Sequence, residues 1–221
     1  MDQPASAYQA ARNLMVDGQV RPNKVTNQRL IDAMRTLPRE RFVPAHLASL
    51  AYADEDVPLG GGRYLTEPMV IARLIQSAAV RPGERALVVA AGSGYAAALL
   101  AACGASVVAL EEDPALLALA RTTLGRAAPS VSIVSGPLQQ GWPAGGPYDI
   151  VLIDGGVETL PTEIYDQVKR GGRLLMVRAS QGQVSQAVLG EPTPSGPSFQ
   201  ALFDCATPPL ACMRRQPGFV F

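Results

Sequence analysis

Residues 85–111 read RALVVAAGSGYAAALLAACGASVVALE, and no charged side chain lies between the first and last of them. An uncharged run of this length is long enough to cross a bilayer. Glycines at positions 92, 94 and 104 interrupt it and leave apolar runs at 85–90 and 106–110, with an Ala/Leu-rich run at 95–103 between them. This pattern is typical of a strand, a helix and a second strand. The stretch therefore predicts a βαβ unit rather than a membrane span.

The same alternation continues toward the C-terminus. Asp113 and Pro114 suit the N-cap and first position of a helix after the second strand. Alternating strands and helices predict an α/β fold with a doubly wound, mostly parallel sheet. The tail, residues 199–221, is expected to add two antiparallel strands. The other expected elements are strands at 131–135, 148–154 and 173–177, and a helix at about 160–169.

The first eighty residues have a different organisation. Apolar residues recur at helical spacing at 28–34 and 69–79, and a long loop is expected at 52–68. With 221 residues and 48% hydrophobic content, one domain is the default expectation. Within it, residues 1–80 are expected to form a helical cap with one long loop, and residues 81–221 a sheet with a tail.

Charge and cysteine content exclude several classes of protein. Lys plus Arg and Asp plus Glu both number 19, so no net field attracts nucleic acid or an anionic membrane surface. The cysteines, Cys103, Cys205 and Cys212, lie in apolar surroundings, which is typical of reduced thiols rather than a disulfide framework. The polar start, residues 1–13, lacks the features of a secretory signal. We expect a cytoplasmic protein that binds no nucleic acid, membrane or metal.

The turn at the end of the first strand has the chemistry of a ligand site. Ligands of doubly wound sheets bind beyond the carboxyl end of this strand, where glycines let them approach the backbone. Glu111 closes the next strand, where a carboxylate can accept both hydroxyls of a ribose. Together they indicate an adenosine-containing ligand; the simpler alternative is a structural turn and a solvent-facing acid. The candidate contacts are Ala91, Gly92, Ser93, Gly94 and Glu111.

The residues after Gly94 bear on which adenosine ligand is bound. Gly94 is followed by Tyr95, Ala96 and Ala97, so the turn does not complete the G-x-G-x-x-G pattern of dinucleotide sites and places bulk near the path of a pyrophosphate. S-adenosylmethionine has no phosphate. It therefore fits this turn better than a dinucleotide does.

Two segments near the front of the chain carry a recognisable signature. Residues 33–44 read AMRTLPRERFVP, and residues 57–68 read VPLGGGRYLTEP. They resemble the AM..(V/L)PRE.FVP signature and the LPIG.GQTIS.P loop of protein-L-isoaspartate O-methyltransferases, and both are specific to that family. Its more widely shared RVLEIGTGSGY, GDG..G, FD and GG.L segments resemble residues 85–95, 136–141, 148–149 and 171–174. The resemblance runs from about residue 15 to residue 177.

This resemblance implies a doubly wound sheet with a reversed final strand, and an S-adenosylmethionine-dependent enzyme. Its substrate would be a protein or peptide bearing isoaspartate, whose side-chain carboxylate is methylated. That group has a pKa near ~4 and is already an anion, so the reaction needs alignment and exclusion of water rather than a general base. Thr66 matches a serine that holds the substrate carboxylate, although capping of the following helix is an alternative. His46 is expected to be a structural or surface residue.

Five positions depart from the cofactor motifs of that family. Val88 replaces an acid, Ala90 a glycine, and Pro137 the Asp that meets the adenine amino group. Leu138 replaces a glycine and is expected to bury adenine. Asp154 replaces a threonine and is expected to reach the methionine ammonium or to cap a helix. Lost hydrogen bonds are worth about 0.5–1.5 kcal/mol each, so uncompensated losses weaken cofactor binding.

These departures leave three hypotheses open. The first is an active carboxyl O-methyltransferase with a rebuilt cofactor cleft. The second is a weakly active or non-catalytic relative that serves as a binding or regulatory module. The third is a methyltransferase with a different acceptor.

Overall fold

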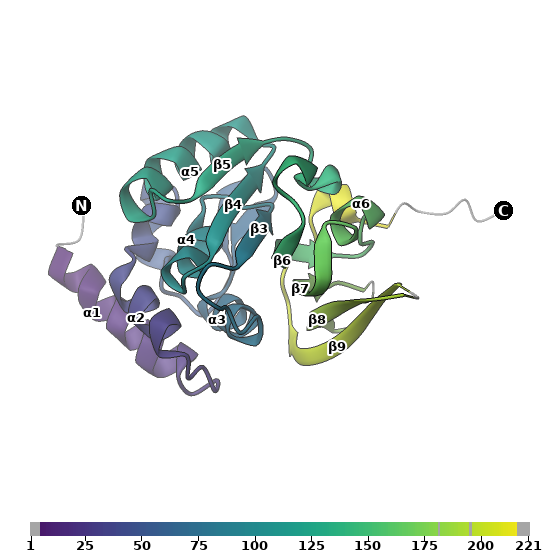
Figure 1. Ribbon diagram of the computed structural model, residues 1–221. Coiled ribbons are helices and arrows are strands. Elements are labelled where there is room, and N and C mark those ends of the chain that lie inside the picture. The colour runs from purple at the N-terminus through teal and green to yellow at the C-terminus, as the bar shows by residue number, and fades with distance from the viewer. Residues whose placement is uncertain (1–4, 181, 195, 216–221) are drawn as a thin grey trace.

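The computed structural model describes residues 5–180, 182–194 and 196–215 of the chain. Within them, seven strands form one sheet in the order β5-β4-β3-β6-β7-β8-β9 (Figure 1). Strands β3 to β7 are parallel, β8 is antiparallel to β7, and β9 is antiparallel to β8. Their bounds are β3 (Arg85–Val89), β4 (Ser106–Glu111), β5 (Ser132–Ser135), β6 (Tyr148–Val157), β7 (Val168–Arg178), β8 (Ser185–Thr193) and β9 (Gly196–Cys205). The predicted α/β fold with a mostly parallel sheet is confirmed.

The C-terminal strands differ from the expectation. The reversed strand is β8, the last but one, and β9 runs parallel to the main set. Strand β8 lies wholly before residues 199–221 and β9 overlaps them only at 199–205, because the two strands pair with each other through the Pro/Gly-rich stretch at 191–197. After β9 the chain forms a short 3-10 turn, Ala211–Met213. The end of the expected tail, 216–221, lies outside the described residues.

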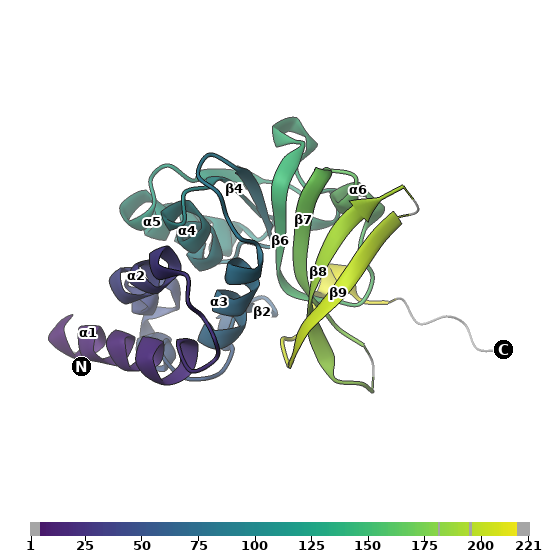
Figure 2. The same ribbon diagram turned by 60° about the horizontal axis from the view of Figure 1, so that its bottom comes forward.

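Helices pack mainly on one side of the sheet (Figure 2). They are α1 (Ala5–Met15), α2 (Gln28–Thr36), α3 (Pro68–Ser77), α4 (Tyr95–Ala102), α5 (Pro114–Ala127) and α6 (Thr162–Tyr165). A π-helical turn, Val16–Val20, and 3-10 turns at Arg39–Phe42, Ala45–Leu50, Leu138–Gln140 and Pro143–Gly145 complete them. Asp113 caps α5 as predicted, since its carboxylate accepts the N–H groups of Ala115 and Leu116. Helix α6 is shorter than expected because Val168 already pairs with Tyr148 at the start of β7.

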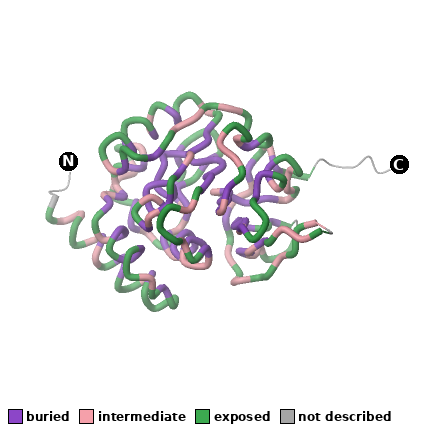
Figure 3. Tube along the Cα trace, viewed as in Figure 1, coloured by how far each residue is buried: buried purple, intermediate pink, exposed green. Residues whose placement is uncertain are grey.

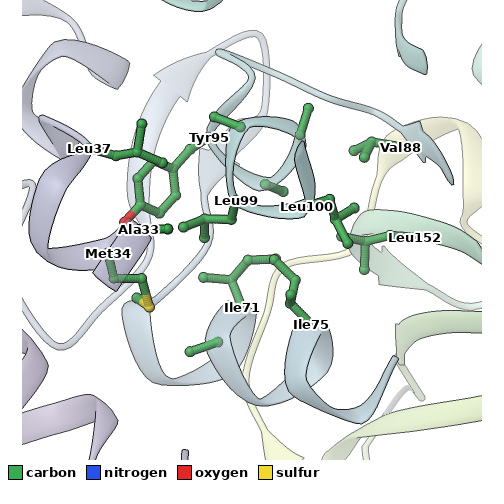
Figure 4. Close-up of a cluster of buried hydrophobic side chains, with 14 of the residues drawn as sticks. Ala33, Met34, Leu37, Ile71, Ile75, Val88, Tyr95, Leu99, Leu100 and Leu152 are labelled. Carbon is green, nitrogen blue, oxygen red and sulfur yellow. The ribbon is translucent and has the colours of Figure 1, made fainter. Parts of the chain in front are cut away.

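Successive side chains of β3 point to opposite faces of the sheet, and the core is divided into two clusters, one on each face. Val88 belongs to the cluster under the helices, with Ile75, Leu100 and Leu152 (Figure 4), whereas Leu87 belongs to the cluster on the other face. Buried residues follow the strands and the inner sides of the helices (Figure 3). The second face is covered by one-turn α6, by short 3-10 turns and by the tail after β9. None of the helices in the described ranges has the length and apolar character needed to cross a membrane.

The segment expected as a loop at 52–68 contains a β-hairpin. Its strands are β1 (Val57–Gly60) and β2 (Arg63–Leu65), which pair antiparallel. The burial alternates along both strands, so that Leu59 and Arg63 turn inward while Tyr64 stays partly exposed. This hairpin brings the loop against the carboxyl edge of the sheet, where the candidate site lies.

Candidate functional site

The turn between β3 and α4 begins the site. Ala90, Gly92 and Gly94 have left-handed backbone, with φ of 64°, 55° and 93°. Glycine adopts this conformation without strain, whereas the Cβ of Ala90 makes it unfavourable there. The N–H of Ala91 donates to the carbonyl oxygen of Leu110 at 3.0 Å, which ties the turn to β4.

The Glu111 carboxylate lies directly against this turn. The N–H of Gly92 donates to Oε2 at 2.8 Å, and those of Glu112 and Asp113 donate to Oε1 at 2.9 and 3.1 Å. The structure therefore brings Glu111 and the glycine turn together. The alternative of a solvent-facing acid is wrong, because Glu111 is 0% exposed.

Arg63 fills the space in front of the carboxylate. Its Nη1 donates to Oε1 of Glu111 at 3.1 Å and its Nη2 to Oε2 at 3.0 Å, a bidentate pair. Nη2 also donates to the carbonyl oxygen of Ala90 at 2.5 Å. Only 8% of Arg63 is exposed. The guanidinium of Arg63 therefore occupies the space in which an adenosine ligand would meet Glu111.

Two small cavities lie beside Arg63. One of about 150 Å³ lies between the hairpin, the end of β4 and the tail, with Leu138 and Leu210 in its wall. Another of about 10 Å³ lies beside Thr66 and Asp154. Small-molecule sites usually measure about 300–1,000 Å³. Neither of these two cavities is large enough for a whole cofactor unless Arg63 moves.

Two leucines, Leu59 of the hairpin and Leu210 of the tail, cover glycine backbone of the site. A Cβ added to Gly92 would lie 3.1 Å from Leu59 of the hairpin, and one added to Gly155 would lie 2.7 Å from Leu210 of the tail. The N–H of Leu210 donates to the carbonyl oxygen of Gly156 at 2.9 Å, which anchors the tail to β6. Hairpin and tail therefore pack directly onto the backbone of the site.

Thr66 and Asp154 meet on the other side of Arg63. The Thr66 hydroxyl donates to Oδ1 of Asp154 at 2.6 Å. The capping alternatives are both wrong, because Glu67 is the N-cap residue of α3 and Asp154 lies within β6. Arg39, which is fully buried, donates from Nη2 to the Thr66 carbonyl oxygen at 2.7 Å. This contact fixes the backbone that carries the Thr66 hydroxyl.

The electrostatics of this pair place a titration close to neutral pH. Burial raises the pKa of Asp154 to about 6, and the charge of Asp56 adds to the rise. The Thr66 hydrogen bond and the charges of Arg63 and Arg39 act in the opposite direction. A carboxyl group that changes charge near neutrality therefore lies beside the candidate catalytic hydroxyl.

Two buried hydroxyls of the site have no hydrogen-bond partner within the described residues, namely Ser93 Oγ and Thr207 Oγ1. Ser93 belongs to the glycine turn, and Thr207 lines the small cavity beside Thr66. Buried hydroxyls are normally paired, so these two are suited to meet a ligand. The Glu111 carboxylate and the Ser93 hydroxyl form an acceptor and donor set that fits an adenosine cofactor once Arg63 has moved, whereas Thr207 lies on the side of Thr66.

The turn after β5 offers an apolar wall. Leu138 is 1% exposed and packs in the same cluster as Leu110. Its N–H is occupied by the Glu112 carboxylate at 3.2 Å, and Pro137 has none to offer. Within this turn, contact with adenine would therefore come from the Leu138 side chain rather than from hydrogen bonds.

Sequence reasoning does not identify Arg63, Arg39 or Leu210 as parts of the site. The available signal for Arg63 is a charged residue directly after three glycines, and its partner is 48 residues away. Arg39 lies in the matched signature, but nothing local indicates its contact with Thr66. For Leu210 the sequence offers no signal. His46, by contrast, is exposed, as expected for a surface residue.

Comparisons with known proteins bear on identity. The family model described as Protein-L-isoaspartate(D-aspartate) O-methyltransferase (PCMT) matches residues 10–190. A protein-L-isoaspartate O-methyltransferase of Methylorubrum populi is 40% identical over 76% of this chain and 79% of its own length. A solved protein-L-isoaspartate O-methyltransferase aligns over 92% of this chain and 66% of its own, with a TM-score of 0.76 and 21% identity.

A second solved structure, a Plasmodium falciparum beta-aspartate methyltransferase in complex with S-adenosyl-L-homocysteine, has a TM-score of 0.72 at 20% identity. It covers 92% of this chain and 97% of its own. At these identities the two solved structures show the fold alone. The family model and the Methylorubrum relative go further, and by them this chain belongs to the family of protein-L-isoaspartate O-methyltransferases, which are S-adenosylmethionine-dependent enzymes.

Proposed function

We propose that this chain transfers the methyl group of S-adenosylmethionine to the side-chain carboxylate of isoaspartyl residues in proteins and peptides. The carrying observation is that Glu111, bonded to the Gly92 turn, and the Thr66–Asp154 pair flank the same residue, Arg63. They lie at the carboxyl edge of the parallel strands, where doubly wound folds bind their ligands. The carboxylate that can bind the cofactor ribose and the hydroxyl that can bind the methyl acceptor therefore lie close to each other. This proximity supports transfer of a methyl group from one subsite to the other.

The cofactor side would be held by residues of β3, β4 and the turn after β5. Glu111 would accept the ribose hydroxyls, and the turn backbone at Ala91–Gly94, with the Ser93 hydroxyl, would face the methionine part. Leu138 would cover adenine. When bound, the cofactor supplies an electrophilic methyl group on a sulfonium.

On the acceptor side, Thr66 would donate a hydrogen bond to the substrate carboxylate, which needs no general base. The Thr66 hydroxyl now donates to Asp154, so it must turn to meet a substrate. A charged Asp154 would also repel the incoming carboxylate. Protonated Asp154 removes that repulsion and supplies a second donor. Asp154 would therefore tune the acceptor subsite rather than accept a proton from the substrate.

The test is a methylation assay with paired peptides. One peptide carries isoaspartate and the other carries aspartate at the same position, each with S-adenosylmethionine at saturating concentration. Base-labile methyl ester should form on the isoaspartyl peptide alone. Thr66→Val, which removes the hydroxyl at similar volume, should raise the peptide KM while leaving S-adenosylhomocysteine binding unchanged. Absence of ester with the wild-type chain would contradict the proposal.

The closed cleft favours one second candidate, a non-catalytic relative that serves as a binding module. Arg63 satisfies Glu111 completely in the described structure, which a permanently closed site would also require. Calorimetry with S-adenosylhomocysteine separates the two functions. No heat of binding at millimolar ligand would favour the module, and micromolar binding would favour the enzyme.

A further inference from the structure

Arg63 lies between the two halves of the site. On the cofactor side its guanidinium bonds to Glu111 and to the Ala90 carbonyl oxygen. On the acceptor side it lines the cavity shared with Thr66 and Asp154, and its charge acts on the Asp154 carboxyl. One buried cation is thus within reach of anions on both sides.

Arg63 and a ribose cannot share the Glu111 carboxylate. Oε1 accepts from Arg63 Nη1 and from the N–H groups of Glu112 and Asp113, while Oε2 accepts from Arg63 Nη2 and the N–H of Gly92. A carboxylate offers about four lone-pair sites, and these five donors already exceed them. A ribose hydroxyl can bind only after Arg63 has left, because the three backbone N–H donors then leave about one site free.

We propose that Arg63 is a gate and a positioning residue. Without cofactor it closes the adenosine side by pairing with Glu111. When a ribose takes Glu111, the guanidinium moves to the acceptor side and pairs with the substrate carboxylate beside Thr66. The second step rests on the proposed function, whereas the first concerns cofactor binding alone.

The hairpin that carries Arg63 has a backbone suited to this movement. Gly60, Gly61 and Gly62 form its tip at φ of 99°, 58° and 72°. A Cβ at Gly60 or Gly62 would meet open space, whereas one at Gly61 would lie 3.1 Å from Oδ2 of Asp113, so the side chain of Asp113 packs against the tip at Gly61 while its two flanking glycines are open.

The displaced guanidinium needs a new anion. Arginine stays charged under all ordinary conditions, and a buried charge without a partner is costly. The nearest anions on the acceptor side are Asp154 and the incoming substrate carboxylate. Cofactor binding therefore prepares the acceptor subsite, and we expect the cofactor to bind before the peptide.

The test uses Arg63→Gln, which removes the charge and keeps an amide donor. Calorimetry should show S-adenosylhomocysteine binding ~10-fold tighter than wild type, equivalent to ~1.4 kcal/mol, because no gate has to be displaced. The KM for an isoaspartyl peptide should rise ~10-fold or more, since a charged hydrogen bond is lost, with a smaller change in kcat. Arg21→Gln is the matched control, because Arg21 lies in the helical cap and its side chain is 60% exposed. It should change neither quantity.

Each outcome is decisive. Unchanged S-adenosylhomocysteine affinity in Arg63→Gln overturns the role of Arg63 as a gate. Tighter cofactor binding with an unchanged peptide KM overturns the movement of the guanidinium to the acceptor side. A wild type that methylates no peptide overturns the proposed function, while the calorimetric comparison still decides the gate. If Arg63→Gln does not fold, Arg63→Lys replaces it. Lysine keeps the charge but cannot bridge both carboxylate oxygens, so cofactor binding should tighten while the peptide KM stays near wild type.

Discussion

Ala90 shows at the residue scale how this site departs from its relatives. Its φ of 64° places a buried Cβ in left-handed backbone, which costs roughly 1–2 kcal/mol. Ala90→Gly removes that strain, while the greater freedom of glycine in the unfolded chain costs about 0.5–1 kcal/mol, so we expect the free energy of unfolding to rise by up to about 1.5 kcal/mol. Ala91→Gly, at a neighbouring residue without positive φ, should lower the free energy of unfolding by about 0.5–1 kcal/mol. Urea unfolding measures both, and equal losses would show that Ala90 is not strained.

Asp154 sets the expected pH dependence of methyl transfer. Its pKa is raised to about 6 by burial, so the side chain is charged above that pH and neutral below it. The repelling charge is then present at high pH, and kcat/KM for an isoaspartyl peptide should rise as pH falls from about 8 to about 6. The groups facing Asp154 are Thr66, Arg63, Arg39 and Asp56.

Two variants test whether Asp154 is the group whose titration shapes the pH profile. Asp154→Asn should flatten the profile of kcat/KM against pH above about 6, because no charge appears there. Asp149→Asn should leave it unchanged, since the Lys169 ammonium beside Asp149 holds the pKa of that carboxyl below its usual value. A slope that survives in Asp154→Asn would assign the titration to another group. Glu67 is the first to consider, because burial, with Asp54 and Asp56 nearby, raises its pKa to about 7.

Strand β3 shows at the element scale why the cofactor motif cannot simply be restored. Val88 is 0% exposed and packs with Leu100 and Leu152 (Figure 4). Val88→Glu restores the acid of the family motif but places it in apolar packing, and we expect a loss of ~3 kcal/mol or more. Val88→Ile adds one apolar methylene to the same packing without a charge, and it should lower the free energy of unfolding by less than Val88→Glu does, by about 1–3 kcal/mol. Urea denaturation compares them, and a stable Val88→Glu variant with tighter S-adenosylhomocysteine binding would contradict this account.

At the scale of the whole molecule, the cap and the sheet share one core. The cluster under the helices includes Leu30 and Met34 from α2, Ile71 from α3 and Leu152 from β6. We propose that residues 1–80 and 81–221 form one domain and unfold together. Calorimetry should give one transition with equal calorimetric and van't Hoff enthalpies. Two resolved transitions would show that the cap is a separate unit.

The sequence by itself determined the parts of this protein that depend on local patterns. The βαβ unit at 85–111, the Asp113 cap and the position of Glu111 beside the glycine turn follow from periodicity, turn residues and strand order. The signature at 33–44 and the loop at 57–68 identified the family. Each of these signals lies within a short window or follows from the rules of parallel sheets.

Only the tertiary structure decided whether the site is open. Arg63 reaches Glu111 because a hairpin hidden in the expected loop docks on the edge of the sheet, and Leu210 arrives from beyond β9 to cover Gly155. The pairing of Thr66 with Asp154 joins residues 88 positions apart. Local sequence encodes turns and periodicity, whereas side-chain pairing across such distances depends on how the elements pack, and packing is set by the whole chain at once.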